Sequence, residues 1–184
     1  MKHEVIIAGF GGQGVMVAGE LLAYAGMLEG KKVSWLPSYG PEMRGGTANC
    51  SVVVSDEEIA SPVVTEPTVL VVMNRPSLDK FEGWLVPGGL LIINTSLVKR
   101  EPSRDDINIV RIPCSEVADE LGSAAVANMI VVGAVVSRTG IVKMESVVEG
   151  LKKVVPAHRH NLIPLNLKAL EKGREIALGV AVCS

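Results

Sequence analysis

The 184 residues suffice for one domain with a substantial core, built from Val, Ile, Leu, Ala and Met because aromatic residues make up only 3%. Few aromatic residues argue against a stacking platform for single-stranded nucleic acid, and a net charge of -2 without a basic block argues against duplex binding. No apolar run approaches the roughly 18 residues of a membrane span, and the N-terminus lacks a signal-peptide pattern, so we expect a cytoplasmic protein that binds neither nucleic acid nor membrane.

A glycine-rich turn joins the first predicted strand to the first predicted helix. The apolar run at residues 5–8 predicts a strand, and apolar residues at helical spacing from 18 to 28 predict a helix. Between them, Gly9, Gly11 and Gly14 fit the G-x-G-x-x-G pattern, with Gly12 and Gln13 inside it. Such glycines permit a tight reversal and close backbone approach. The exposed amides at the helix start favour an anion such as phosphate or carboxylate.

The second predicted strand, at residues 32–36, lacks the partner that a dinucleotide site needs. In such sites an acidic residue about 20 residues beyond the glycines binds the ribose hydroxyls. Here the strand ends in Pro37, Ser38 and Tyr39, while Glu29 lies before it and Glu42 lies beyond it. Two interpretations of the glycine turn therefore stay open. It is either a nicotinamide or flavin site that lacks the usual ribose contact, or a structural turn in a nucleotide-binding type of fold, and we favour the structural turn.

The loop after the second strand is the other notable segment. It reads Ser38-Tyr39-Gly40-Pro41-Glu42-Met43-Arg44-Gly45-Gly46. In a parallel sheet this loop leaves the same edge as the glycine turn, where ligand crevices form. Arg44 beside a glycine pair suits phosphate or carboxylate recognition, whereas an ion pair with Glu42 would make the segment an ordinary surface loop. We favour a docking loop for a ligand or a subunit.

Strands and helices alternate along the rest of the chain. The apolar patterns predict strands at 47–55, 68–73, 90–94 and 107–112, and a further short extended piece at 59–64. Helices are predicted at 75–85, 115–121, 124–137, 144–154 and 161–178, and a charged surface excursion at 98–106. This order predicts an α/β, Rossmann-like layered domain around a mostly parallel sheet, with additional C-terminal helices. We expect a single domain over residues 1–184.

The cysteine and histidine residues do not predict a metal site. Cys50, Cys114 and Cys183 are far apart and form no C-x-x-C spacing, so we expect small buried apolar residues, with Cys183 on the C-terminal tail. His158 and His160 are two residues apart, which on a helix points them to different faces. A solvated histidine pair is therefore favoured over a metal site.

Three further side chains have two interpretations each. Asn128, before an apolar helical run, either satisfies a buried backbone group, which we favour, or reaches a ligand. Trp35 and Trp84 are expected to anchor the core or an interface rather than to stack on a cofactor.

The two glycine-containing loops together resemble one protein family. The segments Gly9-Phe-Gly-Gly-Gln-Gly14, Pro37 to Thr47 and Ala48-Asn49-Cys50 are similar to the gamma subunit of 2-oxoacid:ferredoxin oxidoreductases. The similarity continues through residues 74–81, 87–89 and 128–133, so it covers most of the chain. The Gly-Pro-Glu-Met-Arg-Gly-Gly loop resembles the 2-oxoglutarate and branched-chain (2-oxoisovalerate) members more than the pyruvate members.

The resemblance implies a non-catalytic subunit of an oxidoreductase complex. Such complexes decarboxylate a 2-oxoacid on thiamine diphosphate with magnesium, pass electrons through iron-sulfur clusters to ferredoxin, and release acyl-CoA. In this family the thiamine and cluster sites belong to alpha, beta and delta subunits or domains. We therefore expect alpha, beta and, in some complexes, delta subunits as partners, and no cofactor bound by this chain alone.

The family's gamma subunit packs on alpha and helps to form the coenzyme A site. By resemblance the residues at the entrance for CoA are Gly9, Gly11, Gly12, Gln13, Gly14, Ser38, Tyr39, Gly40, Pro41, Glu42, Met43, Arg44, Gly45, Gly46 and Asn49. Arg44 is the expected anionic contact, and no catalytic residue or metal ligand is expected. Two alternatives stay open: an independent Rossmann-like nucleotide-binding reductase, and a small-molecule-binding module. A homodimer is a further arrangement open to the isolated chain.

Overall fold

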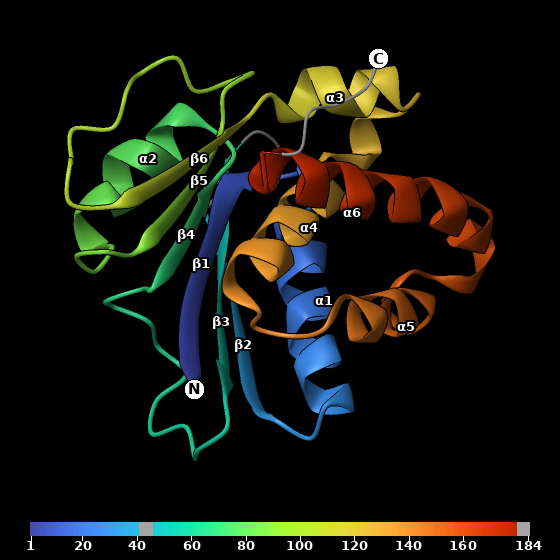
Figure 1. Ribbon diagram of the computed structural model, residues 1–184, viewed down its shortest axis with the longest axis horizontal. Helices are drawn as coiled ribbons and strands as arrows, with labels where there is room; N and C mark the ends of the chain where they lie inside the picture. The colour runs from blue at the N-terminus through green and yellow to red at the C-terminus, as the bar shows by residue number, and fades with distance from the viewer. Residues whose placement is uncertain (41–45, 180–184) are drawn as a thin grey trace.

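A six-stranded sheet forms the centre of the computed structural model, which describes residues 1–40 and 46–179 (Figure 1). The strands are β1 (Lys2–Phe10), β2 (Lys32–Tyr39), β3 (Thr47–Ser55), β4 (Val69–Val72), β5 (Leu90–Asn94) and β6 (Asn108–Ile112). The α-helices are α1 (Val15–Leu28), α2 (Arg75–Phe81), α3 (Cys114–Glu120), α4 (Ala127–Thr139), α5 (Met144–Val154) and α6 (Ile163–Ala177). The described residues also form the short 3₁₀ helices η1 (Glu82–Trp84), η2 (Ala124–Val126) and η3 (Ala157–Leu162).

The strands lie in the order β2-β3-β1-β4-β5-β6. β1, β4, β5 and β6 pair in parallel, whereas β3 pairs antiparallel with both of its neighbours, β1 and β2. β2 therefore points in the same direction as β1, with β3 reversed between them. The predicted α/β class, with a mostly parallel sheet and C-terminal helices, is confirmed, and β3 makes the sheet a mixed one.

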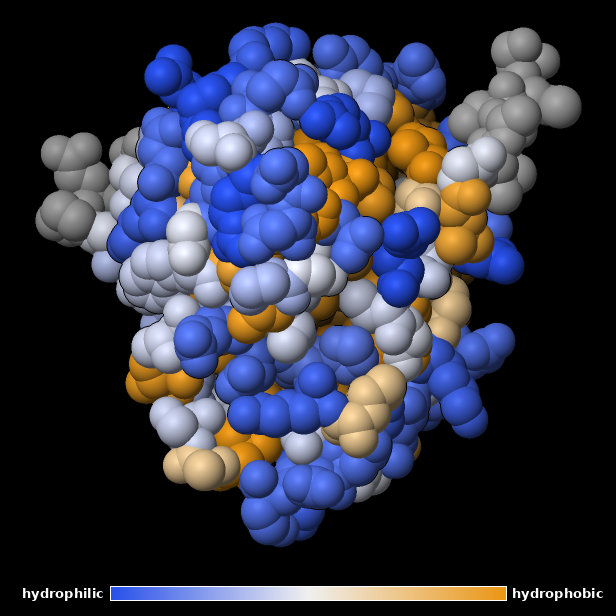
Figure 2. Space-filling view, turned by 60° about the vertical axis from the view of Figure 1, so that its left-hand side comes forward, coloured by the Kyte–Doolittle hydropathy of each residue, from blue (hydrophilic) through white to orange (hydrophobic). Residues whose placement is uncertain are grey.

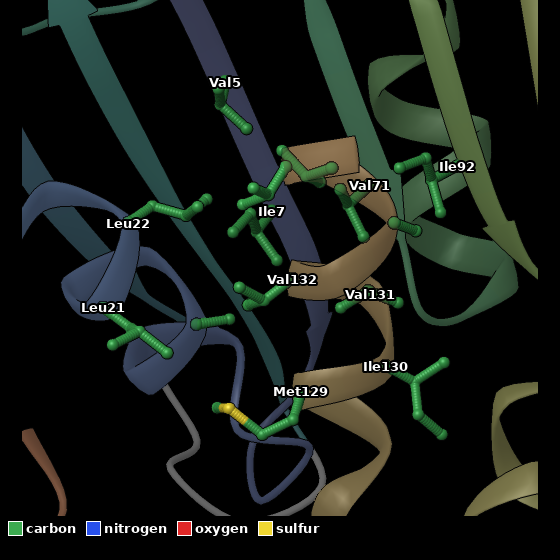
Figure 3. Packing of buried hydrophobic residues seen from close by; sticks show 14 of the residues in the cluster. Val5, Ile7, Leu21, Leu22, Val71, Ile92, Met129, Ile130, Val131 and Val132 are labelled. Carbon is green, nitrogen blue, oxygen red and sulfur yellow. The ribbon is translucent and has the colours of Figure 1, made fainter. Parts of the chain in front are cut away.

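Helices cover both faces of the sheet (Figure 1). In β1, Val5 and Ile7 belong to the hydrophobic cluster with α1 and α4, whereas Ile6 and Ala8 belong to the cluster with α2. Figure 3 shows Val5 and Ile7 directed toward the side chains of α1 and α4. β4 and β5 are buried on both faces, which explains why their sequences are continuously apolar.

The apolar helix α4 is enclosed by this chain's own elements. It contacts α6, α1, α3 and β5. Two glycines allow α4 and α6 to approach closely: a Cβ atom added to Gly133 would collide with the Leu170 carbonyl, and one added to Gly173 would collide with that of Ile130. The helix predicted at 124–137 is thus η2 followed by α4, and its small residues allow close packing.

The other predicted helices are present, with boundaries that differ by a few residues. The helix predicted at 75–85 is α2 followed by η1, and the Asn74 side chain accepts a hydrogen bond from the Ser77 N–H at its start. The helix predicted at 144–154 is α5. The one predicted at 161–178 begins as η3 and continues as α6.

The extended piece predicted at 59–64 is wrong, because these residues pair with no strand of the described sheet. Pro62 has no N–H to donate to a sheet ladder. Val64 is buried, but Val63 is 56% exposed, so the segment does not present a continuous apolar face. It forms part of the irregular connection between β3 and β4.

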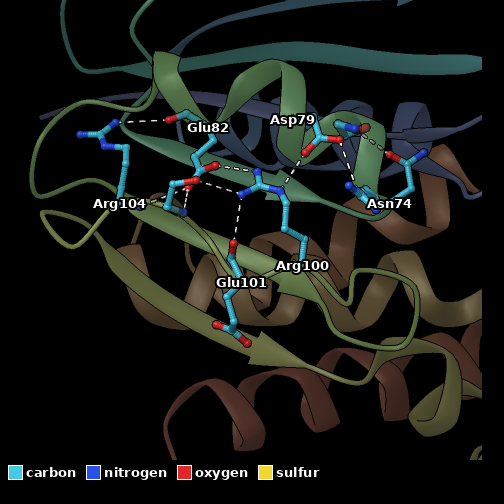
Figure 4. Close-up of polar contacts among 9 residues, drawn as sticks. Asn74, Asp79, Glu82, Arg100, Glu101 and Arg104 are labelled. Atoms are coloured by element: carbon cyan, nitrogen blue, oxygen red, sulfur yellow. Dashed lines mark hydrogen bonds and ion pairs between the residues drawn. The ribbon is translucent and has the colours of Figure 1, made fainter.

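The excursion predicted at 98–106 is an irregular segment that a buried carboxylate holds to the α2 side of the sheet (Figure 4). Arg100 Nη2 donates to Glu82 Oε2 at 2.6 Å, and Arg100 Nε donates to Asp79 Oδ1 at 2.8 Å. The backbone N–H groups of Ser103 and Arg104 donate to Glu82 Oε1. The charged segment is thus fixed in place although most of its residues are exposed.

Hydrophilic side chains cover most of the face shown in Figure 2, with smaller groups of hydrophobic side chains exposed between them. Isolated exposed apolar residues are normal on a folded protein. In the two described ranges of the chain, none of the helices combines the length and the apolar character needed to cross a membrane.

Candidate functional site

The glycine turn between β1 and α1 is held together by one of its own side chains. Gly12 and Gly14 have φ angles of 94° and 73°, a left-handed backbone that favours glycine. The Gln13 side chain accepts from the Phe10 N–H at 2.6 Å and donates to the Met73 carbonyl at 3.4 Å. The side chain of Gln13, one of the predicted binding residues, therefore stabilises the backbone of the turn.

Two glycines of this turn allow close packing against other elements. A Cβ atom on Gly9 would lie 2.9 Å from Cβ of Met73, and one on Gly14 would collide with the Asn128 side chain. Asn128 Nδ2 donates to the Gly14 carbonyl at 3.2 Å. The favoured interpretation of Asn128, a buried amide that satisfies a backbone group, is confirmed, and the start of α4 is thereby joined to the turn.

The residue that ends the connection between β2 and β3, Gly46, lies directly beside the glycine turn. The Gly11 N–H donates to the Gly46 carbonyl at 2.9 Å, and the Gly40 N–H donates to the Thr47 carbonyl at 2.9 Å. Both bends therefore lie at the edge of the sheet where β1 and β2 end. Five of the predicted binding residues are outside the described residues: Pro41, Glu42, Met43, Arg44 and Gly45.

A surface hollow of about 320 Å³ lies between the two bends, and we call it the glycine-turn hollow. Its described walls are the glycine turn, the first turn of α1, Tyr39 and Ala48, none of which carries a charged side chain. No side chain caps α1, and its first turn contains no acidic residue. The partial positive charge at this hollow therefore comes from the first amides of α1, which suits an anionic group.

Two predicted residues lie on the opposite face of the sheet from this hollow. Asn49 pairs with Ala8 and Ser38, and Ala8 packs on the α2 side. Tyr39 pairs with Ala48, which packs on the α1 side. Because side chains alternate between the two faces of a strand, Ser38 and Asn49 point away from the hollow and Tyr39 points toward it. The sequence motif groups these three residues together, whereas the sheet places Ser38 and Asn49 on one face and Tyr39 on the other.

The described cysteines are buried thiols, as predicted. Burial raises the pKa of Cys50 and of Cys114 to about 12, so neither is a thiolate at neutral pH. Cys183 lies outside the described residues. His158 and His160 are exposed on η3, as a solvated pair would be. Across the residues that the structure describes, no three His, Cys, Asp or Glu side chains gather closely enough to hold a metal ion.

A second cavity on the α1–α4 side of the glycine turn was not predicted from the sequence. Arg159 and Asn166 are among the residues in its wall. The sequence does contain one signal for this cavity: the stretch between Glu149 and Glu171, which includes Arg159 and Asn166, has no Asp or Glu.

Comparison with known proteins places this geometry in a family. The model of the pyruvate ferredoxin/flavodoxin oxidoreductase family matches residues 4–176, almost the whole chain. The chain belongs to this family. The gamma-subunit recognition made from the glycine turn and the β2–β3 loop is thereby confirmed.

Two relatives from Methanothermobacter marburgensis are similar over nearly all of this chain. The ketoisovalerate oxidoreductase subunit VorA is 39% identical over 177 residues, which are 95% of this chain and 36% of VorA. The 2-oxoglutarate synthase subunit KorC is 38% identical over 185 residues, covering 97% of this chain and 98% of KorC. This chain thus spans about a third of the length of one relative and nearly all of the other.

Solved structures of the family have the same fold. The gamma subunit of keto/oxoacid ferredoxin oxidoreductase from Geobacter sulfurreducens PCA has a TM-score of 0.84 at 30% identity, covering 97% of this chain and 99% of that one. The 2-oxoglutarate:ferredoxin oxidoreductase from Magnetococcus marinus, whose structure contains 2-oxoglutarate, coenzyme A and succinyl-CoA, has a TM-score of 0.88 at 24% identity. The likeness covers 98% of this chain and 32% of the Magnetococcus chain, and it shows a shared fold.

Proposed function

We propose that this chain is the gamma subunit of a thiamine diphosphate-dependent complex that acts on 2-oxoglutarate or a branched-chain 2-oxoacid. The complex decarboxylates the 2-oxoacid oxidatively, reduces ferredoxin and forms acyl-CoA. The similarity to KorC and VorA supports these two substrate classes. Thiamine diphosphate, magnesium and the iron-sulfur clusters are assigned to the alpha, beta and delta partners, and residues 1–184 to one gamma-type domain.

The edge strand β2 supports a role inside a complex. Its outer side has no neighbouring strand in the described sheet, and Trp35, Leu36 and Tyr39 are 37%, 40% and 56% exposed. An exposed edge strand with large apolar side chains is usually covered by another chain or otherwise protected. A subunit that packs against β2 would bury these side chains.

The observation that carries the proposed coenzyme A contact is the hydrogen bond from Gly11 N–H to the Gly46 carbonyl. This bond holds Gly46, where the β2–β3 loop ends, next to the glycine turn and the uncapped start of α1, and Arg44 comes two residues before Gly46 in the sequence. Backbone amides and a guanidinium together suit the phosphate groups of CoA. The proposed role of this chain is to contribute these groups to a CoA site that its partners complete.

The test is the substitution Arg44→Ala in the reconstituted complex. We expect the KM for CoA to rise by about tenfold or more, as the loss of a charge-assisted hydrogen bond to phosphate predicts, while subunit assembly and the KM for the 2-oxoacid stay unchanged. The readouts are methyl viologen reduction by 2-oxoacid plus CoA and the elution volume of the complex in gel filtration.

Arg138→Ala is the matched control, because Arg138 is an exposed arginine at the end of α4, near the start of β4 and far from the glycine turn in the fold. It should leave the KM for CoA unchanged. An unchanged KM in Arg44→Ala would remove the proposed contact. Saturable binding of NADH or FAD to the chain without its partners would instead favour an independent nucleotide-binding reductase.

A further inference from the structure

Exposed apolar side chains gather on helix α1 and on the edge strand β2. In the described part of the chain twelve large hydrophobic residues are exposed, and six of them belong to these two elements: Val17, Met27, Leu28, Trp35, Leu36 and Tyr39. The other six are spread over the rest of the described chain. Such a concentration marks a contact site for another protein.

The two elements form one outer surface. A Cβ atom on Gly19 of α1 would lie 3.0 Å from Trp35 Nε1, so the tryptophan of β2 packs against the helix. Met16 of α1 and Tyr39 of β2 both line the glycine-turn hollow. Met27 follows Met16 after about three helical turns, so both methionines lie on one side of α1. We call Met16, Met27, Trp35 and Tyr39 together the α1–β2 surface.

The α1–β2 surface is almost free of charge. Helix α1 contains one charged residue, Glu20, and β2 contains one, Lys32, whose Nζ lies 2.8 Å from Glu58 Oε1. A helix whose outer face stays in water normally carries several charged side chains there. The surface therefore suits an apolar face of another protein, with a basic side chain opposite the exposed Glu20.

The backbone of β2 presents every second residue to the free edge of the sheet. The Gly40 N–H donates to the Thr47 carbonyl at 2.9 Å, so the backbone of Gly40 is directed toward β3. Residues directed toward the neighbouring strand and away from it alternate along an antiparallel pair. In the observed register, the residues whose backbone groups are directed to the free edge are Val33, Trp35, Pro37 and Tyr39.

Pro37 interrupts this free edge. Proline has no N–H group, so the row of outward donors has a gap between Trp35 and Tyr39. A strand added at this edge would have a carbonyl without a donor at the gap and would meet the pyrrolidine ring. Proline at an outward position is one of the ways in which proteins protect an edge strand from strand addition.

We propose that Pro37 decides how other chains associate with β2. It prevents a second copy of this chain from adding a strand, and it leaves the α1–β2 surface to an apolar helix face of the partner subunit. A helix fits this role because its backbone groups are paired within the helix, so it needs no hydrogen bonds from the edge.

This inference rests on the proposed function for the identity of the partner. About a third of VorA resembles this chain, so the rest of that polypeptide is a protein neighbour of the domain. The inference adds the surface that such a neighbour covers, the absence of strand addition from the contact, and the residue responsible.

The first test measures self-association of the full chain by gel filtration with light scattering. Pro37→Val restores the outward N–H, so its molar mass should rise toward twice the wild-type value as the protein concentration increases. Pro37→Thr restores the same N–H with a less apolar side chain, so association of both variants would come from the backbone. Pro62→Val is the matched control, because Pro62 lies in the irregular connection between β3 and β4, and it should keep the wild-type mass.

The role of Pro37 is wrong if both Pro37 variants keep the wild-type mass, or if Pro62→Val associates as strongly as they do. Far-UV circular dichroism of each variant shows whether the fold is kept, and the two substitutions at Pro37 give two independent chances of a folded variant.

The second test measures binding of the full chain to its partner subunits by isothermal titration calorimetry. Met27 is 58% exposed, so Met27→Asp should leave the fold intact. Its dissociation constant should rise about tenfold or more, because an unpaired carboxylate would be buried in an apolar contact. Leu97→Asp is the matched control, since Leu97 is 47% exposed and follows β5, on the other side of β1 in the sheet. It should leave the dissociation constant unchanged.

The outcomes separate this inference from the proposed function. A wild-type chain that binds no partner subunit rejects the complex itself. A wild-type chain that binds, together with equal dissociation constants for Met27→Asp and Leu97→Asp, rejects only the α1–β2 surface as the contact.

Discussion

Glu82 shows how a single side chain can organise a charged segment that has no regular structure. Its burial would favour the protonated form, but hydrogen bonds from Arg100 and from the backbone N–H groups of Ser103 and Arg104 outweigh burial and lower the pKa of Glu82. Arg100 also binds Asp79, so one guanidinium links two carboxylates (Figure 4). The sequence predicted a charged excursion here, but it did not single out Glu82, whose partners lie about 20 residues further along the chain.

Substitution of Glu82 tests this arrangement through its pH dependence. A lowered pKa in the folded state means that the ionised carboxylate stabilises the fold above the ordinary pKa of 4.5 and that this stabilisation is lost as the pH falls. We expect Glu82→Gln to lower the free energy of unfolding by about 1 to 3 kcal/mol at pH 7, because a hydrogen-bonded charge is removed. The difference from wild type should shrink toward about pH 3, as urea titrations at both pH values would measure.

Glu101→Gln is the control for this prediction. Glu101 forms an ion pair with Arg111, but its side chain is 74% exposed, so its removal should change the free energy of unfolding by less than about 1 kcal/mol. An equal loss of stability in Glu82→Gln and Glu101→Gln, or a loss in Glu82→Gln that does not depend on pH, would contradict the role given to Glu82.

At the scale of elements, the contact between α4 and α6 depends on backbone approach rather than on large side chains. Gly133 and Gly173 each face a carbonyl of the other helix where a Cβ atom would not fit. The sequence shows that α4 is apolar on all sides, which predicts burial. It does not show which helix lies against which, because periodicity identifies a face but not its partner.

Gly133→Ala should therefore destabilise the protein, although alanine is the better helix former. The added methyl group meets backbone, which cannot rotate away, so α4 and α6 must separate. We expect a loss of about 1 to 3 kcal/mol in the free energy of unfolding, measured by urea denaturation. Gly83→Ala is the control, since a Cβ atom there would meet nothing within 4 Å; it should be neutral or slightly stabilising. Equal behaviour of the two variants would refute the packing argument.

At the scale of the whole molecule, the sequence was sufficient to predict the layered α/β arrangement but not the order of the strands in the sheet. Continuous apolar runs correctly identified β4 and β5, since these strands are buried on both faces. The insertion of β3 between β2 and β1 could not be read from local patterns, because alternation in a strand does not specify its neighbours. The motif grouped Ser38 and Asn49 with Tyr39 for a different reason. The predicted strand ended at residue 36, whereas β2 continues to Tyr39, so alternation along the strand places the side chains of Ser38 and Tyr39 on opposite faces. The second cavity combines segments more than 100 residues apart in the chain, so it too required the structure.

The sheet also joins the two hydrophobic clusters into what we expect to be one cooperative unit. Neighbouring residues of β1, β4 and β5 alternate between the clusters, so loss of either one would remove the support of the other. The two tryptophans report on the two sides. Trp35 pairs with Val52 of the α1-side cluster, and Trp84 packs edge-on against Phe81 of the α2-side cluster at 5.1 Å.

We predict that the variants Trp35→Phe and Trp84→Phe, each with one remaining tryptophan, unfold in urea with a single transition. Within each variant the midpoint from tryptophan fluorescence should equal the midpoint from far-UV circular dichroism, because both clusters share the central strands. The dichroism curve also corrects for any change in stability that the substitution itself causes. If fluorescence of Trp84 changed at a lower urea concentration than the dichroism of the same variant, the α2 side would unfold separately, and residues 1–184 would not be a single cooperative domain.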